Sequence, residues 1–264
     1  MPTPTLRPDE QEPERILKEL GLRVSLVPTA SSRTPDFIVD GDARGYLFEV
    51  KAREDSKTWT RAMNSGQVAC QQRSMGYGRW AEDVASEAVK QFRSVDPQHL
   101  RWWVLWLAIK CVASPDAMGQ ESIGTLFGVR QVVYRDDAHS KEQGKCCLFA
   151  RPGVFERHPE IVASIVDSGG GLCFCVNDEF SEDFNSFQQS VLWSYFARIH
   201  PPTTATDLTK SGGYLRVDLS VDRKDDSALQ AYLERAYRLN KAIMLDVKVP
   251  SGTIAPSLWK GSAT

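Results

Sequence analysis

The residues best suited to chemistry in this sequence are two acids and a lysine: Asp36, Glu49 and Lys51. Asp36 follows Pro35 and opens the apolar run FIVD, whereas Glu49 and Lys51 end the segment YLFEVK. Both segments predict strands, joined by a turn rich in Gly and Asp, so the two carboxylates converge from adjacent strands. Such a pair is what a hard divalent cation such as Mg²⁺ needs, since it takes oxygen ligands and keeps several waters. A lysine beside that cation can hold an attacking water or the charge developing on a phosphate.

Strand periodicity sorts the side chains of the second segment. Alternate residues of a strand point to opposite faces, so Glu49 and Lys51 share one face. Tyr46, Phe48 and Val50 then point the other way, into a core. A plain hairpin with a surface Glu/Lys pair explains these two charges but not the arrangement around them.

The flanking sequence predicts the elements that must position these residues. Ile16, Leu17 and Leu20 have helical spacing, and Gly21 can end that helix. The continuous apolar run over 100–109 predicts a strand buried on both faces. In chain order, we expect a helix over 11–20, strands over 23–27, 36–40 and 45–53, a helix over 80–94 and a strand over 100–109.

This part of the chain resembles the PD-(D/E)XK nuclease superfamily, whose motif is matched by Pro35, Asp36, Glu49 and Lys51. The resemblance implies an α/β fold with a restriction-endonuclease-like core of helix, three strands, helix and strand. It also implies a Mg²⁺-dependent endonuclease, with Mn²⁺ as a substitute, that hydrolyses DNA phosphodiester bonds through catalytic Asp36, Glu49 and Lys51. Members are often homodimers, work in restriction, phage defence or repair, and can act with a separate motor or specificity protein.

Two further metal ligands are expected. The backbone carbonyl of Val50 can supply another oxygen. The resemblance implies a glutamate from the first helix, and Glu14 is the choice because it lies on the same helical stripe as Leu17. Glu10 and Glu12 lie nearer the N-terminus. A solvated helix face is the alternative for Glu14.

A long polar segment over 54–78, without predicted secondary structure, follows the motif. Basic residues in and beside it are candidates to contact nucleic acid, and a solvated surface loop is an equal alternative. The resemblance adds a polar residue from the next helix, for which Gln91 is chosen over Lys90 and Arg93. The nucleic-acid-binding candidates are Arg53, Lys57, Arg61, Arg73, Arg79 and Gln91.

Composition limits the class of protein. A chain of 264 residues with 42% hydrophobic and 25% charged residues is typical of a soluble globular protein. The net charge of −2 argues against a general basic nucleic-acid binder. The longest apolar run, Trp102 to Ile109, is too short to span a bilayer, and the N-terminal sequence lacks the apolar core of a signal peptide. We therefore expect a cytoplasmic protein with no membrane partner.

Cysteine usage fits that compartment. The six cysteines show no regular framework, so reduced thiols are expected. Cys146, Cys147, Cys173 and Cys175 could together bind zinc, but the usual two-residue gap within each pair is absent. Buried structural cysteines are the favoured interpretation.

The expected organisation is a disordered tail over 1–10, a nuclease-like core over 11–115 and an α/β extension over 116–264, packed on the core. The extension predicts a hairpin over 123–134 and 145–154, a helix over 159–167, a strand over 172–176, a helix over 184–198, a loop over 201–213, a strand over 214–221 and a helix over 227–239.

Two other functions stay open. The chain could be a catalytically inactive nucleic-acid-binding module with the same fold, although its intact acid, acid and lysine set argues against this. It could also be an unrelated α/β small-molecule enzyme whose chemistry lies in 145–239.

Overall fold

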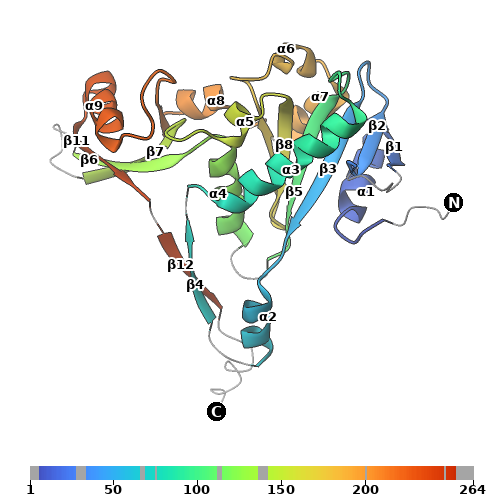
Figure 1. Ribbon diagram of the computed structural model, residues 1–264, viewed down its shortest axis with the longest axis horizontal. Coiled ribbons are helices and arrows are strands. Elements are labelled where there is room, and N and C mark those ends of the chain that lie inside the picture. Colours follow the sequence, from blue (N-terminus) through green and yellow to red (C-terminus); the bar gives the residue numbers. More distant parts are fainter. Residues whose placement is uncertain are drawn as a thin grey trace.

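The computed structural model describes residues 6–27, 34–65, 69–74, 76–111, 115–135, 142–199, 201–246 and 248–253 (Figure 1). This part of the chain is an α/β protein with mixed sheets. Its helices are α1 (Gln11–Glu19), α2 (Lys57–Asn64), α3 (Arg79–Val95), α4 (Pro115–Leu126), α5 (Val154–Arg157), α6 (Phe184–Phe187), α7 (Val191–Ile199), α8 (Ala205–Lys210) and α9 (Asp226–Tyr237).

A six-stranded sheet organises the molecule, in the order β1-β2-β3-β5-β8-β9. Its strands are β1 (Arg23–Leu26), β2 (Phe37–Asp40), β3 (Tyr46–Arg53), β5 (Trp102–Ile109), β8 (Ile161–Asp167) and β9 (Leu172–Val176). The central strands β3, β5 and β8 are parallel, and the outer strands pair antiparallel. Every residue of β5 is buried, as a continuous apolar run predicts for a central parallel strand.

Helices cover both faces of this sheet, and β3 divides its side chains between them. Leu47 joins the core that α3 and α4 complete. Phe48 and Val50 join the other core, which α1 and α7 complete. The predicted faces of Tyr46, Phe48 and Val50 are confirmed, because all three are buried in this second core.

A smaller sheet lies beside the first, in the order β10-β7-β6-β11. Its strands are β10 (Tyr214–Arg216), β7 (Glu142–Leu148), β6 (Arg130–Arg135) and β11 (Asn240–Leu245). Helix α9 packs against it through Leu229 and Leu233, which are fully buried. The predicted helix over 227–239 is confirmed by α9.

An arm projects from the rest of the molecule (Figure 1). It consists of α2 and a two-stranded ribbon of β4 (Ala69–Ser74) with β12 (Lys248–Thr253). The segment over 54–78 was expected to lack secondary structure, and the arm corrects this. The strand escaped prediction because its partner lies at 248–253, and no local pattern reveals such a distant pairing.

The later part of the chain corrects three more expectations. Residues 161–167 form strand β8 rather than a helix, since their Ile and Val residues fill the sheet interior. Helix α8, Ala205–Lys210, lies within the expected loop over 201–213. The hairpin of β6 and β7 is confirmed, but residues 123–126 belong to α4.

The segments before and after the expected boundary near residue 115 contribute strands to the same sheet. Strands β8 and β9 come from the 116–264 segment and extend the same sheet as β3 and β5. Residues 1–5 of the expected tail lie outside the described residues, whereas Glu10 is buried at the start of α1. In the described part of the chain, no helix is long and apolar enough to cross a membrane.

Candidate metal centre

Strand β3 brings Glu49 and Lys51 together on the face that α3 covers. Their order along the strand gives them the same orientation as Leu47, two residues earlier. The Lys51 Nζ lies 2.6 Å from Glu49 Oε1. The Glu49 side chain is only 1% exposed and that of Lys51 is 17% exposed. The predicted pair is therefore a largely buried ion pair rather than a surface one.

Asp36 reaches the same place from the bend before β2. Its backbone N–H donates to the carbonyl of Phe48 at 3.0 Å. Its carboxylate Oδ2 accepts a hydrogen bond from the Val50 N–H at 2.8 Å. The β2–β3 ladder ends at Phe37 and Phe48, so this carboxylate takes the place of a backbone acceptor just beyond it. The Asp36 side chain is thereby fixed beside the segment that carries Glu49.

The two carboxylates influence each other electrostatically. Burial and the nearby charge of Glu49 raise the pKa of Asp36 to about 8, against the Val50 hydrogen bond and the Arg7 charge. Burial also raises the pKa of Glu49, and Lys51 opposes that rise. A carboxylate resists ionisation in such a place unless a positive charge compensates it. A bound cation would supply that charge.

The donor set fits a hard cation that needs only one or two protein ligands. Both carboxylate oxygens of Glu49 are buried, and the Lys51 ammonium lies against Oε1. Among the described residues, no group of three or more His, Cys, Asp or Glu side chains is arranged to hold a metal. Mg²⁺ is commonly held by one or two carboxylates, with water and substrate phosphate completing its shell. Asp36 and Glu49 meet that requirement, and the Val50 carbonyl stays a predicted third oxygen.

Two glutamates near the first helix, Glu14 and Glu10, have different surroundings. The Glu14 side chain is 20% exposed and pairs with Lys18 at 2.8 Å, one turn along α1. Glu10, just before α1, is instead 5% exposed, and its charge contributes to the raised pKa of Asp36. Sequence reasoning passed over Glu10 because it assigned residues 1–10 to a disordered tail.

Arg7 was also missed, and it connects these acids. Its Nη2 lies 2.9 Å from Asp36 Oδ1, and its Nε lies 2.5 Å from Glu10 Oε1. Half of the Arg7 side chain is exposed, so it approaches from the solvent side. A cluster of charges directly before a helix, here Arg7, Asp9 and Glu10, is the sequence signal that could have shown it.

Removing this internal counter-charge should strengthen cation binding. We expect Arg7→Ala to raise the affinity for Mg²⁺ about two- to fivefold, the size of a partly exposed ion pair. Isothermal titration calorimetry measures the effect. Arg15→Ala is the matched control, because Arg15 pairs with Glu12 and Glu19 on α1. Weaker Mg²⁺ binding by Arg7→Ala would show that Arg7 supports the site instead of competing with the cation.

Gln91 of α3 lies at the candidate metal centre. Gln91 is buried, its Nε2 donates to the Thr34 carbonyl at 3.2 Å, and its amide lowers the pKa of Glu49. A hollow of about 370 Å³ runs from Gln91 along α3, past Lys90 and Ser86. Among the nucleic-acid candidates whose side chains the structure describes, Gln91 acts on Glu49 of the predicted catalytic set.

The basic candidates follow the end of β3 and the arm instead. Arg53 stacks over Trp80 at 5.5 Å from the ring centre. Lys57 and Arg61 are exposed on α2. Arg79 is exposed at the start of α3 and lies 3.6 Å from Asp83. Arg73 lies in β4, and its side chain is outside the described residues.

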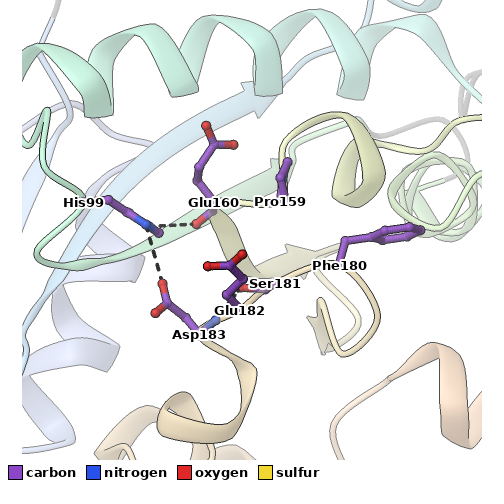
Figure 2. Close-up of a pocket in the computed structure, with 7 residues that line it drawn as sticks. All are labelled: His99, Pro159, Glu160, Phe180, Ser181, Glu182 and Asp183. Atoms are coloured by element: carbon purple, nitrogen blue, oxygen red, sulfur yellow. Dashed lines mark hydrogen bonds and ion pairs between the residues drawn. The ribbon is translucent and has the colours of Figure 1, made fainter.

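A second hollow, of about 340 Å³, lies elsewhere on the molecule and is lined by His99, Glu160 and Asp183 among others. Figure 2 shows His99 pointing toward both acidic residues. Its Nε2 lies 3.2 Å from the Glu160 carbonyl, and its Nδ1 lies 3.6 Å from Asp183 Oδ2. His99 thereby links Glu160 to Asp183, the residue before α6.

The four cysteines considered for zinc lie in two cores, with Cys146 and Cys173 packed in the one that holds Cys175. Cys147 is buried in the core of the smaller sheet, whereas Cys175 is buried in the α3 side of the larger one. The structure therefore offers no four-thiolate site from Cys146, Cys147, Cys173 and Cys175.

Comparison of the chain with protein-family models, curated proteins and solved structures found no match.

Proposed function

We propose that this protein is a metal-dependent endonuclease that hydrolyses DNA phosphodiester bonds and is built on a restriction-endonuclease-like core. One observation carries the proposal: Asp36, Glu49 and Lys51 gather at one place, with two mutually influenced carboxylates beside a lysine. The order of α1, three antiparallel strands, α3 and a parallel β5 supports it.

Each residue has a role in this proposal. Asp36 and Glu49 would hold Mg²⁺, which would supply a hydroxide near neutral pH and offset charge on the phosphate. The Val50 N–H fixes the Asp36 carboxylate, and Gln91 orders Thr34 beside it. Lys51 is placed to hold an attacking water or a nonbridging phosphate oxygen.

The geometry favours this function over its two alternatives. An inactive binding module has no use for buried carboxylates whose pKa values are raised. A small-molecule enzyme centred on 145–239 would leave the buried Glu49–Lys51 ion pair, which lies outside that segment, without a role.

A cleavage assay tests the proposal. The full chain is incubated with supercoiled plasmid, linear duplex and single-stranded DNA, and RNA, each with Mg²⁺, Mn²⁺, Ca²⁺ or EDTA. We expect cleavage of DNA with Mg²⁺ and Mn²⁺ and none with EDTA. Tight Mg²⁺ and DNA binding without cleavage would favour the inactive module, and failure to bind either would reject the fold assignment.

The arm should contribute to binding the nucleic-acid backbone. We expect Arg61→Glu with Arg73→Glu to weaken DNA affinity for all sequences. The slope of log affinity against log salt should flatten by about one unit for each lost phosphate contact. Fluorescence anisotropy in Ca²⁺ measures both quantities. Lys210→Glu with Arg235→Glu, on α8 and α9, is the charge-matched control. Equal affinity and slope in the two double variants would assign the arm a different role.

A further inference from the structure

Two cysteines lie close together on the edge strand of the large sheet. Cys173 and Cys175 alternate with Phe174 along β9, so both side chains point to the same face. Their Sγ atoms are 3.7 Å apart, and both thiols are free. Strand β9 is the last strand of the sheet; β8 pairs with it on one side, and Thr203 forms a single bridge to Cys175 on the other.

Solvent access differs between the two thiols. Cys175 is fully buried, whereas Cys173 is only half-buried. Cys173 lies on the wall of a hollow of about 240 Å³, shared with Gly119 and Ile123 of α4 and with the turn at Gly170. A small reagent can therefore reach Cys173 first, with Cys175 directly behind it.

Local hydrogen bonds shift the pKa values of the two thiols in opposite directions. The thiol of Cys175 and the hydroxyl of Thr203, 3.3 Å away, stabilise a thiolate at Cys173, so its pKa falls to about 7 despite burial. The same interaction and burial raise the pKa of Cys175. Near neutral pH the pair thus holds one nucleophilic thiolate and one thiol.

We propose that Cys173 and Cys175 form a dithiol site that a hydroperoxide oxidises reversibly to a disulfide. The Cys173 thiolate attacks the peroxide O–O bond, giving a sulfenic acid and hydroxide, which takes up a proton to become water. The Cys175 sulfur, losing its proton, then attacks Cys173 Sγ and expels hydroxide, which becomes a second water. In total, the two thiols give two electrons and two protons to hydrogen peroxide, and two waters form.

Strand geometry makes this disulfide easy to reduce. Residues two apart on a strand have Cα atoms about 6.6–6.8 Å apart, at the upper end of the disulfide range. Closing the bond strains β9, where the Phe174 carbonyl accepts from the Thr203 N–H at 2.7 Å. Strained disulfides have higher reduction potentials, so thiol reductants reopen them. This site does not depend on the proposed nuclease activity.

Peroxide titration of the full chain at pH 7 tests the proposal. Remaining thiols are blocked with N-ethylmaleimide, and the tryptic peptide over 158–198, whose cysteines are Cys173 and Cys175, is weighed. We expect this peptide to lose two hydrogen atoms and to escape blocking, with dithiothreitol reversing both changes. Cys175→Ser should stall at a sulfenic acid that dimedone captures at Cys173. Cys111→Ser is the control, because Cys111 is a buried thiol just after the end of β5, outside the 158–198 peptide.

A second measurement needs no variant. Phenylarsine oxide bridges two thiols that are already close, so the unmodified protein should bind it at the 158–198 peptide. Iodoacetamide should also label Cys173 with a rate that rises through a midpoint near pH 7. Absence of arsenical binding there, or preferential oxidation of another cysteine, would overturn the proposal.

Discussion

Asp36→Asn is expected to abolish DNA cleavage while making the metal-free protein more stable at alkaline pH. The substitution removes a carboxylate that we propose as a cation ligand but keeps an oxygen that can accept the Val50 N–H. It also removes a carboxylate whose buried charge opposes folding. Glu49→Gln should abolish cleavage as well, with a smaller gain in stability, because it leaves Lys51 without its partner.

The sign of the stability change follows from linkage. The folded protein binds the Asp36 proton more tightly than the unfolded chain, since the pKa rises from 3.8 to about 8. The unfolding free energy contributed by Asp36 is therefore fully present below about pH 4 and is lost as pH rises toward 8. Removing that carboxylate should add roughly 1–3 kcal/mol at pH 8 in EDTA, and little at pH 4.

Denaturant unfolding at pH 5 and pH 8, in EDTA and in Mg²⁺, measures this effect. Mg²⁺ should stabilise the unmodified protein and have little effect on Asp36→Asn. Asp40→Asn, at the other end of β2, is the control and should keep cleavage and stability. A large loss of stability in Asp36→Asn at every pH would mean that Asp36 is structural.

The local part of this site was predictable from sequence. Alternation along one strand decides which side chains share a face, so Glu49 and Lys51 were expected together, with Phe48 on the opposite face. The structure confirms both expectations. The strands around the motif were also predictable, because their apolar runs are short and continuous.

Features that depend on distant pairing were not predictable. Strand β4 exists through its ladder with β12, and 161–167 is a strand because β5 and β9 flank it. Short segments of this kind have weak intrinsic preference, which tertiary context overrides. Arg7 and Glu10 illustrate the same limit at the site. Their importance comes from a turn that places them against Asp36, and polar composition alone suggests a solvated tail.

Lys51→Ala should reduce the single-turnover rate of DNA cleavage by roughly 10²-fold or more, the usual effect of removing a preorganised charge stabiliser. The Lys51 ammonium is held 2.6 Å from Glu49 and is 17% exposed, so it reaches the site without free movement. Its interaction with phosphate or water strengthens as charge develops, and it therefore belongs to turnover more than to binding.

Affinity measurements separate these two roles. DNA binding in Ca²⁺, which fills the site without supporting chemistry well, should change far less than the rate. Cation affinity should not fall, because removing Lys51 takes away a positive charge that competes for Glu49. Lys210→Ala, exposed on α8, is the matched control and should cleave at nearly the unmodified rate. If Lys51→Ala also cleaves at that rate, Lys51 only neutralises Glu49, and catalysis must depend on the two carboxylates without it.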